Sequence, residues 1–404
     1  MYDAVVIGAR CAGSPTAMLL ARKGYRVLLV DKATFPSDRI NNYYIHQSGT
    51  ARLQRWGLLE QVRASNCPPI RQWTFDLGPV VLTGSPPPMG EVAEGYAPRR
   101  RVIDTILVQA AAAAGSEVRE GFVVQELIGE GERITGIRGH TAGRATVTEK
   151  ARIVIGADGM HSLVARTVQA ASYNAKPSLA CWYYAHWSGV PLEGAEVYAR
   201  DFRSVGVLPT NDGLVLIFVG WPHQEFHEFR ADIAGNFLKT LDLLPGLAAR
   251  VRNGTQVERF RGTADVPNFF RTPYGPGWAL VGDAGYHKDP FTAQGFTDAF
   301  RDAELLTAAI DDGFTGRRPL LEALAEYERQ RNAAALPMYE MTCELATLAP
   351  PSAEQMQLFA ALRGNQAETN RFLGTLAGTV SIPEFFAPEN MQRIIAEGAA
   401  SESK

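Results

Sequence analysis

The sequence predicts an α/β protein, α+β overall, in which a parallel sheet covered by helices is interrupted by a second sheet. Three observations support this prediction. A strand–helix–strand pattern opens the chain over residues 3–30, and such a pattern favours parallel strands. Strand-forming segments dominate from about 172 to 270, and helical periodicity dominates from 296 onward.

Local signals define the opening unit. Residues 14–23 are predicted to form a helix, because Pro15 lies in its first turn and Gly24 follows its last residue. The apolar run 25–30 then forms a second buried strand. Because the chain starts directly with its first strand, at residues 3–8, we expect no signal peptide.

The chain then leaves this unit and returns to it. Helices are predicted at 47–64 and 102–114, and the Pro- and Gly-rich stretch 66–98 between them leaves the first domain. Later elements follow from apolar periodicity. They are strands at 181–187, 213–219 and 278–281 and helices at 231–251 and 296–310.

These elements predict three structural regions. The first is a discontinuous nucleotide-binding domain of residues 1–70, 98–171 and 272–335. The second is a substrate-binding β-sheet domain of residues 71–97 and 172–271, and the third is a helical region of residues 336–404.

Composition excludes several kinds of function. A net charge of −3 provides no basic surface for nucleic acid or an anionic membrane. Four scattered cysteines without a CxxC pair or a His cluster predict reduced thiols and no metal site. No apolar run reaches the roughly 18–20 residues of a membrane span. We therefore expect a cytoplasmic protein that acts on a small molecule, and the sequence does not indicate its oligomeric state.

The turn after the first strand has the features of a dinucleotide site. Gly8 permits a tight turn, and Gly13 lets the following helix pack closely on the strand. The helix N-terminus presents N–H groups and a positive dipole end to a phosphate. Ala12 lies within this turn, and Arg10 replaces the middle glycine of GxGxxG, which suggests a side chain reaching over the cofactor.

An acidic residue ends the second strand. Asp31, followed by Lys32, lies about 20 residues after the glycine-rich turn. A carboxylate here accepts hydrogen bonds from ribose hydroxyls and disfavours a 2′-phosphate. The bound nucleotide is therefore predicted to be the adenosine of FAD or NAD.

Two further segments each follow a buried strand. Asp158-Gly159 follows residues 153–155, and Gly282-Asp283 follows residues 278–281. An aspartate at a strand end can accept a ribityl hydroxyl, and a helix starting at Gly295 aims its positive end at the negative charge of a reduced flavin. Alone, each segment is equally compatible with an ordinary turn; together with the first motif they predict an FAD site.

In this order, the motifs resemble those of the single-component FAD-dependent aromatic hydroxylases, the class A monooxygenases with the p-hydroxybenzoate hydroxylase fold. The resemblance extends over nearly all of residues 1–330. It implies a Rossmann-like FAD-binding domain of the GR2 type, interleaved with a mixed β-sheet substrate domain. It also implies FAD as cofactor, NADPH or NADH as transient electron donor, and O2 as co-substrate.

The resemblance also assigns roles to residues. Asp158 and Gly159 would serve both FAD and the nicotinamide cofactor, and Asp283 would hold the ribityl chain. The segment from Pro290 to Phe296 would line the isoalloxazine. Two residues match other cofactor-contacting positions, namely Arg100 at a helix start and Val124 on the strand that passes the adenine.

The sequence departs from the family pattern at two places. Gly282-Asp283-Ala284-Gly285-Tyr286 replaces Gly-Asp-Ala-Ala-His, and Thr292-Ala293-Gln294-Gly295 replaces Gly-Gly-Gln-Gly. The pair Asp289-Pro290 resembles the corresponding pair of the related flavin halogenases and geranylgeranyl reductases. Halogenases carry Trp-x-Trp-x-Ile-Pro, whereas this chain has only Gly220-Trp221-Pro222, which disfavours halogenation.

By this resemblance, the protein would hydroxylate an aromatic or polyketide-like small molecule through a flavin C4a-hydroperoxide. The flavin carries that chemistry, while the protein excludes water, positions the ring and often supplies a base. His46 and Pro290 are the catalytic candidates, and residues 41–47 are further candidates for reaching the flavin. Tyr184, His186 and Trp221 are the pocket candidates.

Strand alternation places Trp182, Tyr184 and His186 on one face and Tyr183 and Trp187 on the other. It leaves open which face borders the pocket. Three other functions also stay open: a flavin reductase of the geranylgeranyl type, a halogenase, and a non-catalytic flavin-binding sensor.

Overall fold

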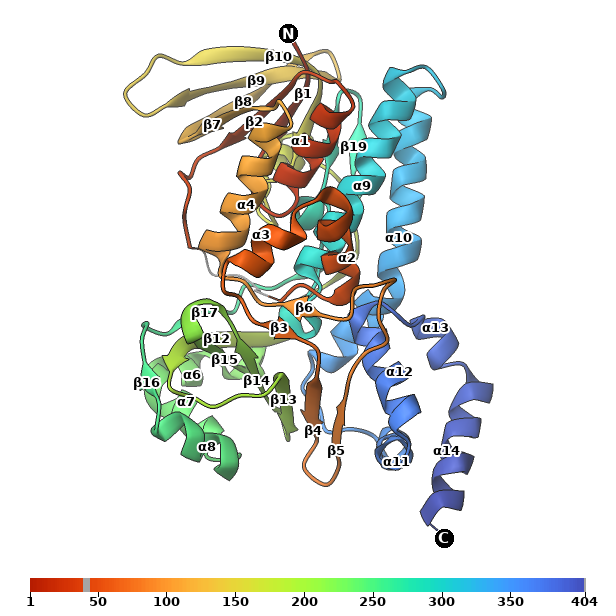
Figure 1. The fold of residues 1–404 in the computed structure, drawn as a ribbon. Helices are drawn as coiled ribbons and strands as arrows, with labels where there is room; N and C mark the ends of the chain where they lie inside the picture. Colours follow the sequence, from red (N-terminus) through yellow and green to blue (C-terminus); the bar gives the residue numbers. More distant parts are fainter. Residues whose placement is uncertain (39–43, 403–404) are drawn as a thin grey trace.

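The computed structural model describes residues 1–38 and 44–402, with side chains up to residue 398. Two large sheets organise these residues, and helices of the C-terminal region pack beside both (Figure 1). This arrangement confirms the mixed α/β prediction and the helical C-terminal region.

The first sheet contains five neighbouring parallel strands. In spatial order they are β20 (Trp278–Leu280), β10 (Val147–Gly156), β1 (Tyr2–Ile7), β2 (Val27–Asp31) and β7 (Glu117–Glu120). β1 and β2 are almost wholly buried, as expected for parallel strands covered on both faces.

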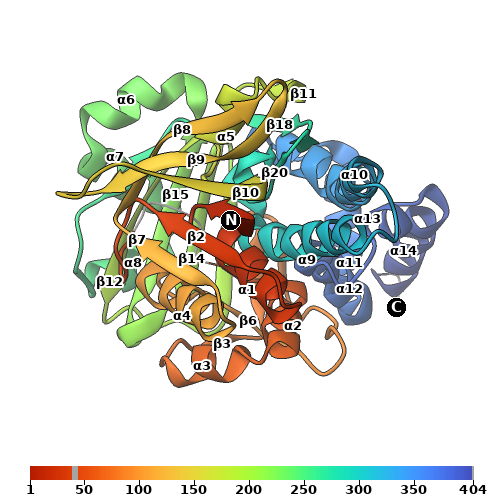
Figure 2. The ribbon, with the colours of Figure 1, turned by 90° about the horizontal axis from the view of Figure 1, so that it is seen from above.

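Helices and a hairpin cover the two faces of this sheet (Figure 2). Helices α1 (Gly13–Arg22) and α4 (Arg100–Ala113) lie on one face, and the long helix α9 (Gly295–Phe314) packs against α1. The antiparallel pair β8 (Phe122–Glu130) and β9 (Arg133–Thr141) lies on the other face, where Phe122 and Ile137 pack on the parallel strands.

The second sheet is mainly antiparallel. Its order is β16 (Thr255–Gln256), β12 (Ala180–Ser188), β15 (Val215–Pro222), β14 (Arg203–Pro209), β13 (Ala195–Arg200), β4 (Trp73–Asp76) and β5 (Val81–Gly84). The short strand β17 (Arg261–Thr263) also pairs with β12. Strands β4 and β5 come from the Pro- and Gly-rich stretch, so part of this stretch pairs with the second sheet.

A small third sheet links the two large ones. It consists of β11 (Ser172–Lys176), β18 (Asn268–Arg271) and β21 (Tyr286–His287). The remaining short strands form a two-stranded sheet, β3 (Pro69–Ile70) with β6 (Gly95–Tyr96), and the strand β19 (Tyr274–Gly275) beside β20.

Two of the predicted helices are broken. The single helix predicted at 231–251 is wrong, because three short helices cover the second sheet there: α6 (Phe226–Ala231), α7 (Ile233–Leu241) and α8 (Pro245–Arg252). Asp232 caps α7 by accepting the Gly235 N–H, and Pro245 starts α8. Likewise, Gly57 at φ 77° separates α2 (Gln47–Trp56) from α3 (Leu59–Ala64).

The C-terminal region is helical, as predicted. Helix α10 (Leu320–Leu345) packs along α9 and runs unbroken across residue 336, where the third region was predicted to begin. Four further helices follow: α11 (Ala353–Arg363), α12 (Gln366–Ala377), α13 (Ile382–Phe385) and α14 (Pro388–Glu402). They share an apolar cluster with β5, in which Leu82, Leu362 and Phe385 are buried. None of the helices that the structure describes is long and apolar enough to cross a membrane.

Candidate functional site

The predicted cofactor motifs meet at one edge of the first sheet. Strands β20, β10, β1 and β2 are adjacent and parallel, so the residues that follow them lie side by side. We call this line of loops the carboxyl edge; it comprises residues 8–13, 31–33, 157–159 and 282–284. Ligands of open parallel sheets bind at this kind of edge.

The loops of the carboxyl edge touch through their main chains. A Cβ atom on Gly13 would lie 1.8 Å from the carbonyl oxygen of Gly8, and one on Gly8 would lie 2.4 Å from the carbonyl oxygen of Ala157. One on Gly282 would lie 2.6 Å from the Cβ of Ala12. Gly8 and Gly282 also have positive φ angles of 105° and 61°. No side chain fits at these positions, so the N-terminus of α1 stays accessible to a phosphate.

The carboxylate of Asp31 is fixed at this edge. Its Oδ2 accepts the Ala9 N–H at 2.8 Å, and its Oδ1 accepts the Ala33 N–H at 2.8 Å. Asp31 is buried, whereas the neighbouring Lys32 is exposed and Val124 is half-buried on β8. Asp31 therefore lies where a ribose hydroxyl is predicted, while direct contacts from Lys32 and Val124 stay predictions.

Arg10 is held by other side chains. Its guanidinium donates to Asp104 at 2.5 Å and to Ser37 Oγ at 2.8 Å, and it lies 5.2 Å from the ring centroid of Phe35. Arg100 pairs with the same carboxylate at 3.0 Å. Two guanidinium groups thus share one buried carboxylate near the start of α1.

Two acidic residues at the carboxyl edge keep unfilled acceptor oxygens. Asp158 Oδ2 accepts the Leu163 N–H at 2.6 Å, whereas its buried Oδ1 has no partner among the described residues. Burial raises the pKa of this carboxyl. Asp283 is half-buried, and no described residue bonds to its carboxylate. Such acceptors suit the hydroxyl groups of a flavin nucleotide.

The segment before α9 leads away from this edge. Ala293 has a φ of 56°, and a Cβ atom on Gly295 would meet nothing within 4 Å, so the start of α9 faces open space. Pro290 is half-buried. Phe296, predicted to line the isoalloxazine, is 2% exposed and packs under Arg100, so it supports the site from the core.

A cavity of about 1150 Å³ lies next to this segment. Its lining comes from the chain around His46, from β4, β13, β14 and β15, from residues 291–293, and from the helical C-terminal region. Most of its lining side chains are apolar and many of them are aliphatic, and the following are aromatic: Trp73, Phe75, Phe218, Phe291, Phe359, Phe372 and Phe386. A large apolar cavity of this kind suits a bulky ring system.

His46 lies at the end of the cavity that borders residues 292 and 293. It is 4% exposed, and its Nε2 lies 2.9 Å from the carbonyl oxygen of Thr292. Because a carbonyl only accepts, Nε2 carries the proton and Nδ1 keeps its lone pair. Burial lowers the pKa of His46 to about 4, so the imidazole is neutral at physiological pH. Of the segment 41–47, residues 41–43 lie outside the described residues.

Strand β12 alternates as predicted, but its residues do not line the cavity. Tyr184 is buried in the cluster that contains Tyr44 and Trp73, and His186 lies 3.2 Å from Glu258. Trp221 packs on the opposite face of the sheet, below α6–α8, and donates to Thr240 Oγ1 at 2.9 Å. None of these three residues is among those that line this cavity, because their side chains pack in the cores. Their contact with a substrate stays a prediction.

The sequence does not predict that Trp182 of β12 contacts the segment before α9. Trp182 Nε1 donates to Asp289 Oδ1 at 3.1 Å, and the indole contacts Phe218 and Phe291 with ring centroids about 6 Å apart. Asp289 is 1% exposed, its Oδ2 has no partner in the described part of the chain, and burial raises its pKa to about 7. Side chains alternate along β15, so Phe218 and Trp221 lie on opposite faces of the sheet. This alternation is visible in the sequence and separates Phe218 from the face that carries Trp221.

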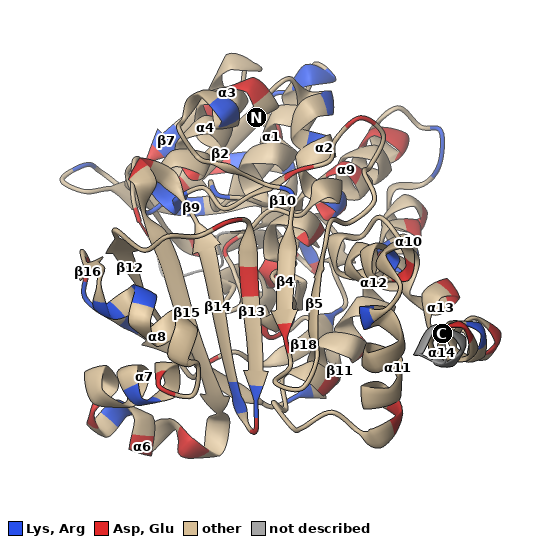
Figure 3. Ribbon diagram, turned by 60° about the horizontal axis from the view of Figure 1, so that its bottom comes forward, with Lys and Arg blue, Asp and Glu red and all other residues tan. Residues whose placement is uncertain are grey.

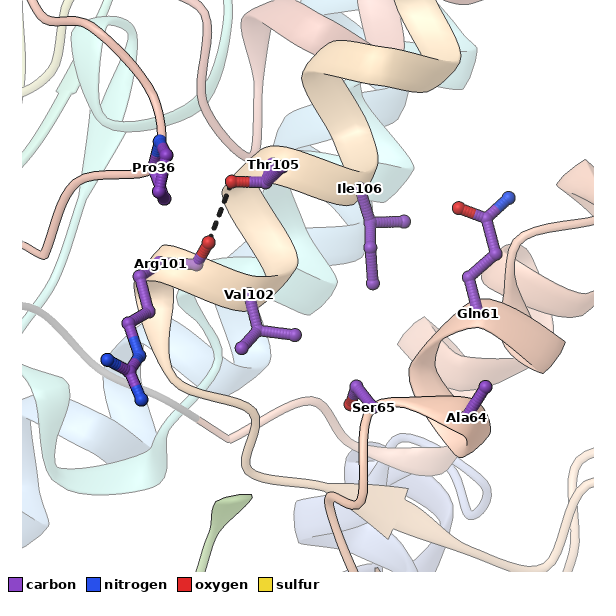
Figure 4. A pocket seen from close by; sticks show the side chains of 8 residues that line it. All are labelled: Pro36, Gln61, Ala64, Ser65, Arg101, Val102, Thr105 and Ile106. Atoms are coloured by element: carbon purple, nitrogen blue, oxygen red, sulfur yellow. Dashed lines mark hydrogen bonds between the residues drawn. The ribbon is translucent and has the colours of Figure 1, made fainter. Parts of the chain in front are cut away.

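A second hollow of about 640 Å³ lies between α3, α4 and Pro36 (Figure 4). Arg101 is its one charged lining residue, and it pairs with Asp212 at 2.7 Å. The other lining side chains are small or aliphatic except for Gln61. None of the predicted site residues lines this hollow.

Comparison with known proteins identifies the family. The model of a family described as an FAD binding domain matches residues 1–342. The chain belongs to this FAD-binding family. It is a flavoprotein oxidoreductase, and the loops, the two arginines and the unfilled carboxylate oxygens of the carboxyl edge fit the nucleotide that defines the family.

Relatives of this FAD-binding protein carry out different reactions. A digeranylgeranylglycerophospholipid reductase of Methanosarcina acetivorans is 26% identical over 347 residues, which cover 82% of this chain and 80% of that protein. A tryptophan 2-halogenase of Chondromyces crocatus is 26% identical, covering 80% of this chain and 64% of that protein. A kynurenine 3-monooxygenase of Salinispora arenicola is 26% identical, covering 85% of this chain and 78% of that protein.

Solved structures share the fold at low sequence identity. The myxobacterial chondrochloren halogenase CndH matches with a TM-score of 0.79 at 20% identity, covering 99% of this chain and 97% of that chain. PqsL of Pseudomonas aeruginosa, described as a probable FAD-dependent monooxygenase, matches with a TM-score of 0.70 at 20% identity. The match covers 91% of this chain and 99% of that chain. These likenesses establish the fold.

Proposed function

We propose that this flavoprotein is an FAD- and NAD(P)H-dependent monooxygenase that hydroxylates a bulky aromatic or polyketide-like small molecule. The cavity of about 1150 Å³ carries the proposal, because Thr292 and Ala293 line it and belong to the segment predicted to border the isoalloxazine. A large apolar cavity that is lined partly by aromatic rings and adjoins this segment suits ring hydroxylation.

The residues of the chain have separate tasks in this proposal. Gly8, Gly13 and Asp31 hold the nucleotide half of FAD, and Asp158 and Asp283 offer their unfilled oxygens to its hydroxyl groups. FAD, when bound, supplies the redox chemistry that activates oxygen. The aromatic side chains of the cavity orient the substrate ring and exclude water.

His46 is the proposed acceptor of a hydrogen bond from the substrate. Its Nδ1 carries the lone pair, and its ring borders the cavity. A phenolic O–H of the substrate can donate to this atom, which would orient the ring and raise its electron density. Pro290 would act only through the shape of the segment that it starts.

A prenyl-reducing activity is the second candidate, because archaeal reductases are among the relatives. Charged side chains at one end of the cavity make it less suited to a wholly apolar chain. Halogenation has less support, because Trp221 of Gly220-Trp221-Pro222 faces the core and not the cavity. The four free cysteines suit a reducing compartment, and we propose a cytoplasmic location.

The test follows NAD(P)H consumption by the purified FAD-loaded enzyme. A panel of phenols, quinolones and polyketides is supplied with and without oxygen, and product is analysed for the isotope of labelled O2. We expect an aromatic compound to stimulate consumption and to gain one labelled oxygen. Anaerobic turnover of an alkene would indicate a reductase, and a halide-dependent product would indicate a halogenase. Bound FAD with no stimulation by any compound would indicate a non-catalytic role.

A further inference from the structure

The charged side chains that line the cavity are unequally paired. Six are found among its described lining residues: Arg200, Asp201, Arg203, Glu340, Glu344 and Glu354. Both guanidinium groups already have carboxylate partners. Arg200 bonds to Asp76 Oδ1 at 2.9 Å, and Arg203 bonds to Glu225 Oε2 at 2.6 Å.

The arginines are also held in place by further contacts. Arg200 donates to the carbonyl oxygens of Asp76 and Ala199, and the guanidinium of Arg203 lies 3.8 Å from the ring centroid of Trp221. Figure 3 shows basic residues at the adjoining ends of β13 and β14, with an acidic turn between them. To bind a substrate carboxylate, either arginine would first have to leave its present partners.

The carboxylates of the lining are not neutralised in this way. Glu340 and Glu354 are exposed, and no described cation pairs with them. Glu344 Oε1 accepts a hydrogen bond from the Gln355 amide at 3.0 Å, which leaves its charge in place. We call these three residues the acidic rim; they lie on α10 and α11.

At the opposite end of the cavity, the described lining residues carry no compensating positive charge. His46 is neutral, and its neighbours in the lining are Trp73, Phe291 and Thr292. Among the described lining residues, every cation is therefore one of the two paired arginines. A substrate carboxylate would be buried against aromatic rings or placed beside the acidic rim, and an unpaired buried carboxylate is strongly unfavourable.

We propose that the cavity selects polycyclic aromatic molecules without a carboxylate group, and that a charged substituent on such a molecule is an ammonium group beside the acidic rim. This inference rests on the proposed function only in taking the cavity as the substrate site. It separates the chain from hydroxylases of benzoate-type acids, for which an unpaired cation in the cavity would be needed.

The test compares the binding of three matched probes to the FAD-loaded protein without NAD(P)H. They are 2-naphthol, 6-hydroxy-2-naphthoate and 6-(aminomethyl)-2-naphthol, and binding is followed by quenching of protein fluorescence. We expect the naphthoate to bind at least about tenfold more weakly than 2-naphthol. The amine is expected to bind as tightly as 2-naphthol or more tightly, with any gain reduced at high salt.

Charge variants assign the preference to the acidic rim. In the double variant Glu340→Gln with Glu344→Gln, the gain of the amine is expected to disappear while 2-naphthol binding is unchanged within about twofold. Glu344→Lys is expected to improve naphthoate binding. Glu384→Gln is the matched control, because Glu384 is exposed on α13 and does not line the cavity.

Two outcomes would overturn the inference. One is a naphthoate that binds as tightly as 2-naphthol, and the other is a protein that binds none of the three probes. If the probes bind in the expected order but no aromatic compound stimulates NAD(P)H consumption, the monooxygenase proposal fails and the cavity assignment stands.

Discussion

The carboxyl edge and the cavity are built in different ways. At the carboxyl edge, main chains from three loops approach so closely that a Cβ atom on Gly13 would lie 1.8 Å from a carbonyl oxygen. In the cavity, large side chains from segments between His46 and Ile395 meet around a space of about 1150 Å³. The first region therefore tolerates no added atom, whereas the second should respond gradually to changes of side-chain size.

Gly13→Ala should break the carboxyl edge with the largest effect. The added methyl group would overlap the backbone of Gly8, and neither chain can move without separating α1 from β1. We expect a cost above about 3 kcal/mol and loss of most bound FAD. The flavin-to-protein absorbance ratio and the melting temperature measure both. Gly246→Ala, in open space on α8, is the control; normal FAD content in Gly13→Ala would refute the close approach.

Asp289→Asn should change how stability depends on pH, because Asp289 is buried between the two regions and accepts a hydrogen bond from Trp182. Burial raises the pKa of Asp289 from 3.8 to about 7, so the folded state holds more protons than the unfolded state in this range. Wild-type stability should therefore fall as pH rises from about 4 to about 7.

The stability of the asparagine variant should not fall over this pH range, because the amide does not titrate. Its amide oxygen still accepts the Trp182 N–H. The pH-dependent change in the free energy of unfolding should differ between the two proteins by a few kcal/mol when neutral pH is reached. Urea unfolding at several pH values measures it. Parallel pH profiles for both proteins would show that Asp289 does not titrate there.

Asp283→Ala tests the carboxyl edge without disturbing its packing. Because no described residue bonds to this carboxylate, the cofactor-free variant should melt within about 2 °C of the wild type. FAD affinity should fall about 10- to 100-fold through loss of a charged hydrogen bond to the ribityl chain. Fluorescence titration with FAD gives the affinity, and an unchanged value would remove Asp283 from the site.

Phe218→Ala tests the cavity separately from the carboxyl edge. Of the four substitutions, it should have the smallest effect. The substitution enlarges the cavity beside Trp182, so KM for an aromatic substrate should rise about tenfold while FAD content stays normal. Phe202→Ala removes an exposed ring outside the cavity lining and serves as control. A variant that loses FAD instead would show that the two regions are not separable.

The two regions also differ in how far the sequence predicts them. The carboxyl edge depends on short contiguous motifs, in which Gly8, Gly13 and Gly282 are required by backbone geometry, and such requirements are visible in the sequence. Asp31 ends β2, and Asp283 lies three residues after the last residue of β20. The partner of Arg10 was not visible, because Asp104 lies 94 residues away on another element.

The cavity could be predicted only in part. His46 borders the cavity, whereas Tyr184 and Trp221 pack in the cores. Strand alternation alone does not tell which face borders a cavity. Phe359 and Phe372 lie in helices whose apolar faces are evident, but periodicity does not reveal what a face packs against. Long-range packing decided those positions.

The order of the cavity residues along the chain has a consequence for synthesis. The elements of the carboxyl edge and the start of α9 are complete by residue 295, whereas the lining of the cavity extends to Ile395. At about 5–20 residues per second, a ribosome needs roughly 5–20 s to add that last stretch. A nascent chain thus acquires the parts that hold a nucleotide before it can enclose a substrate, and a chain stalled in that interval would carry flavin with its reactive ring open to water.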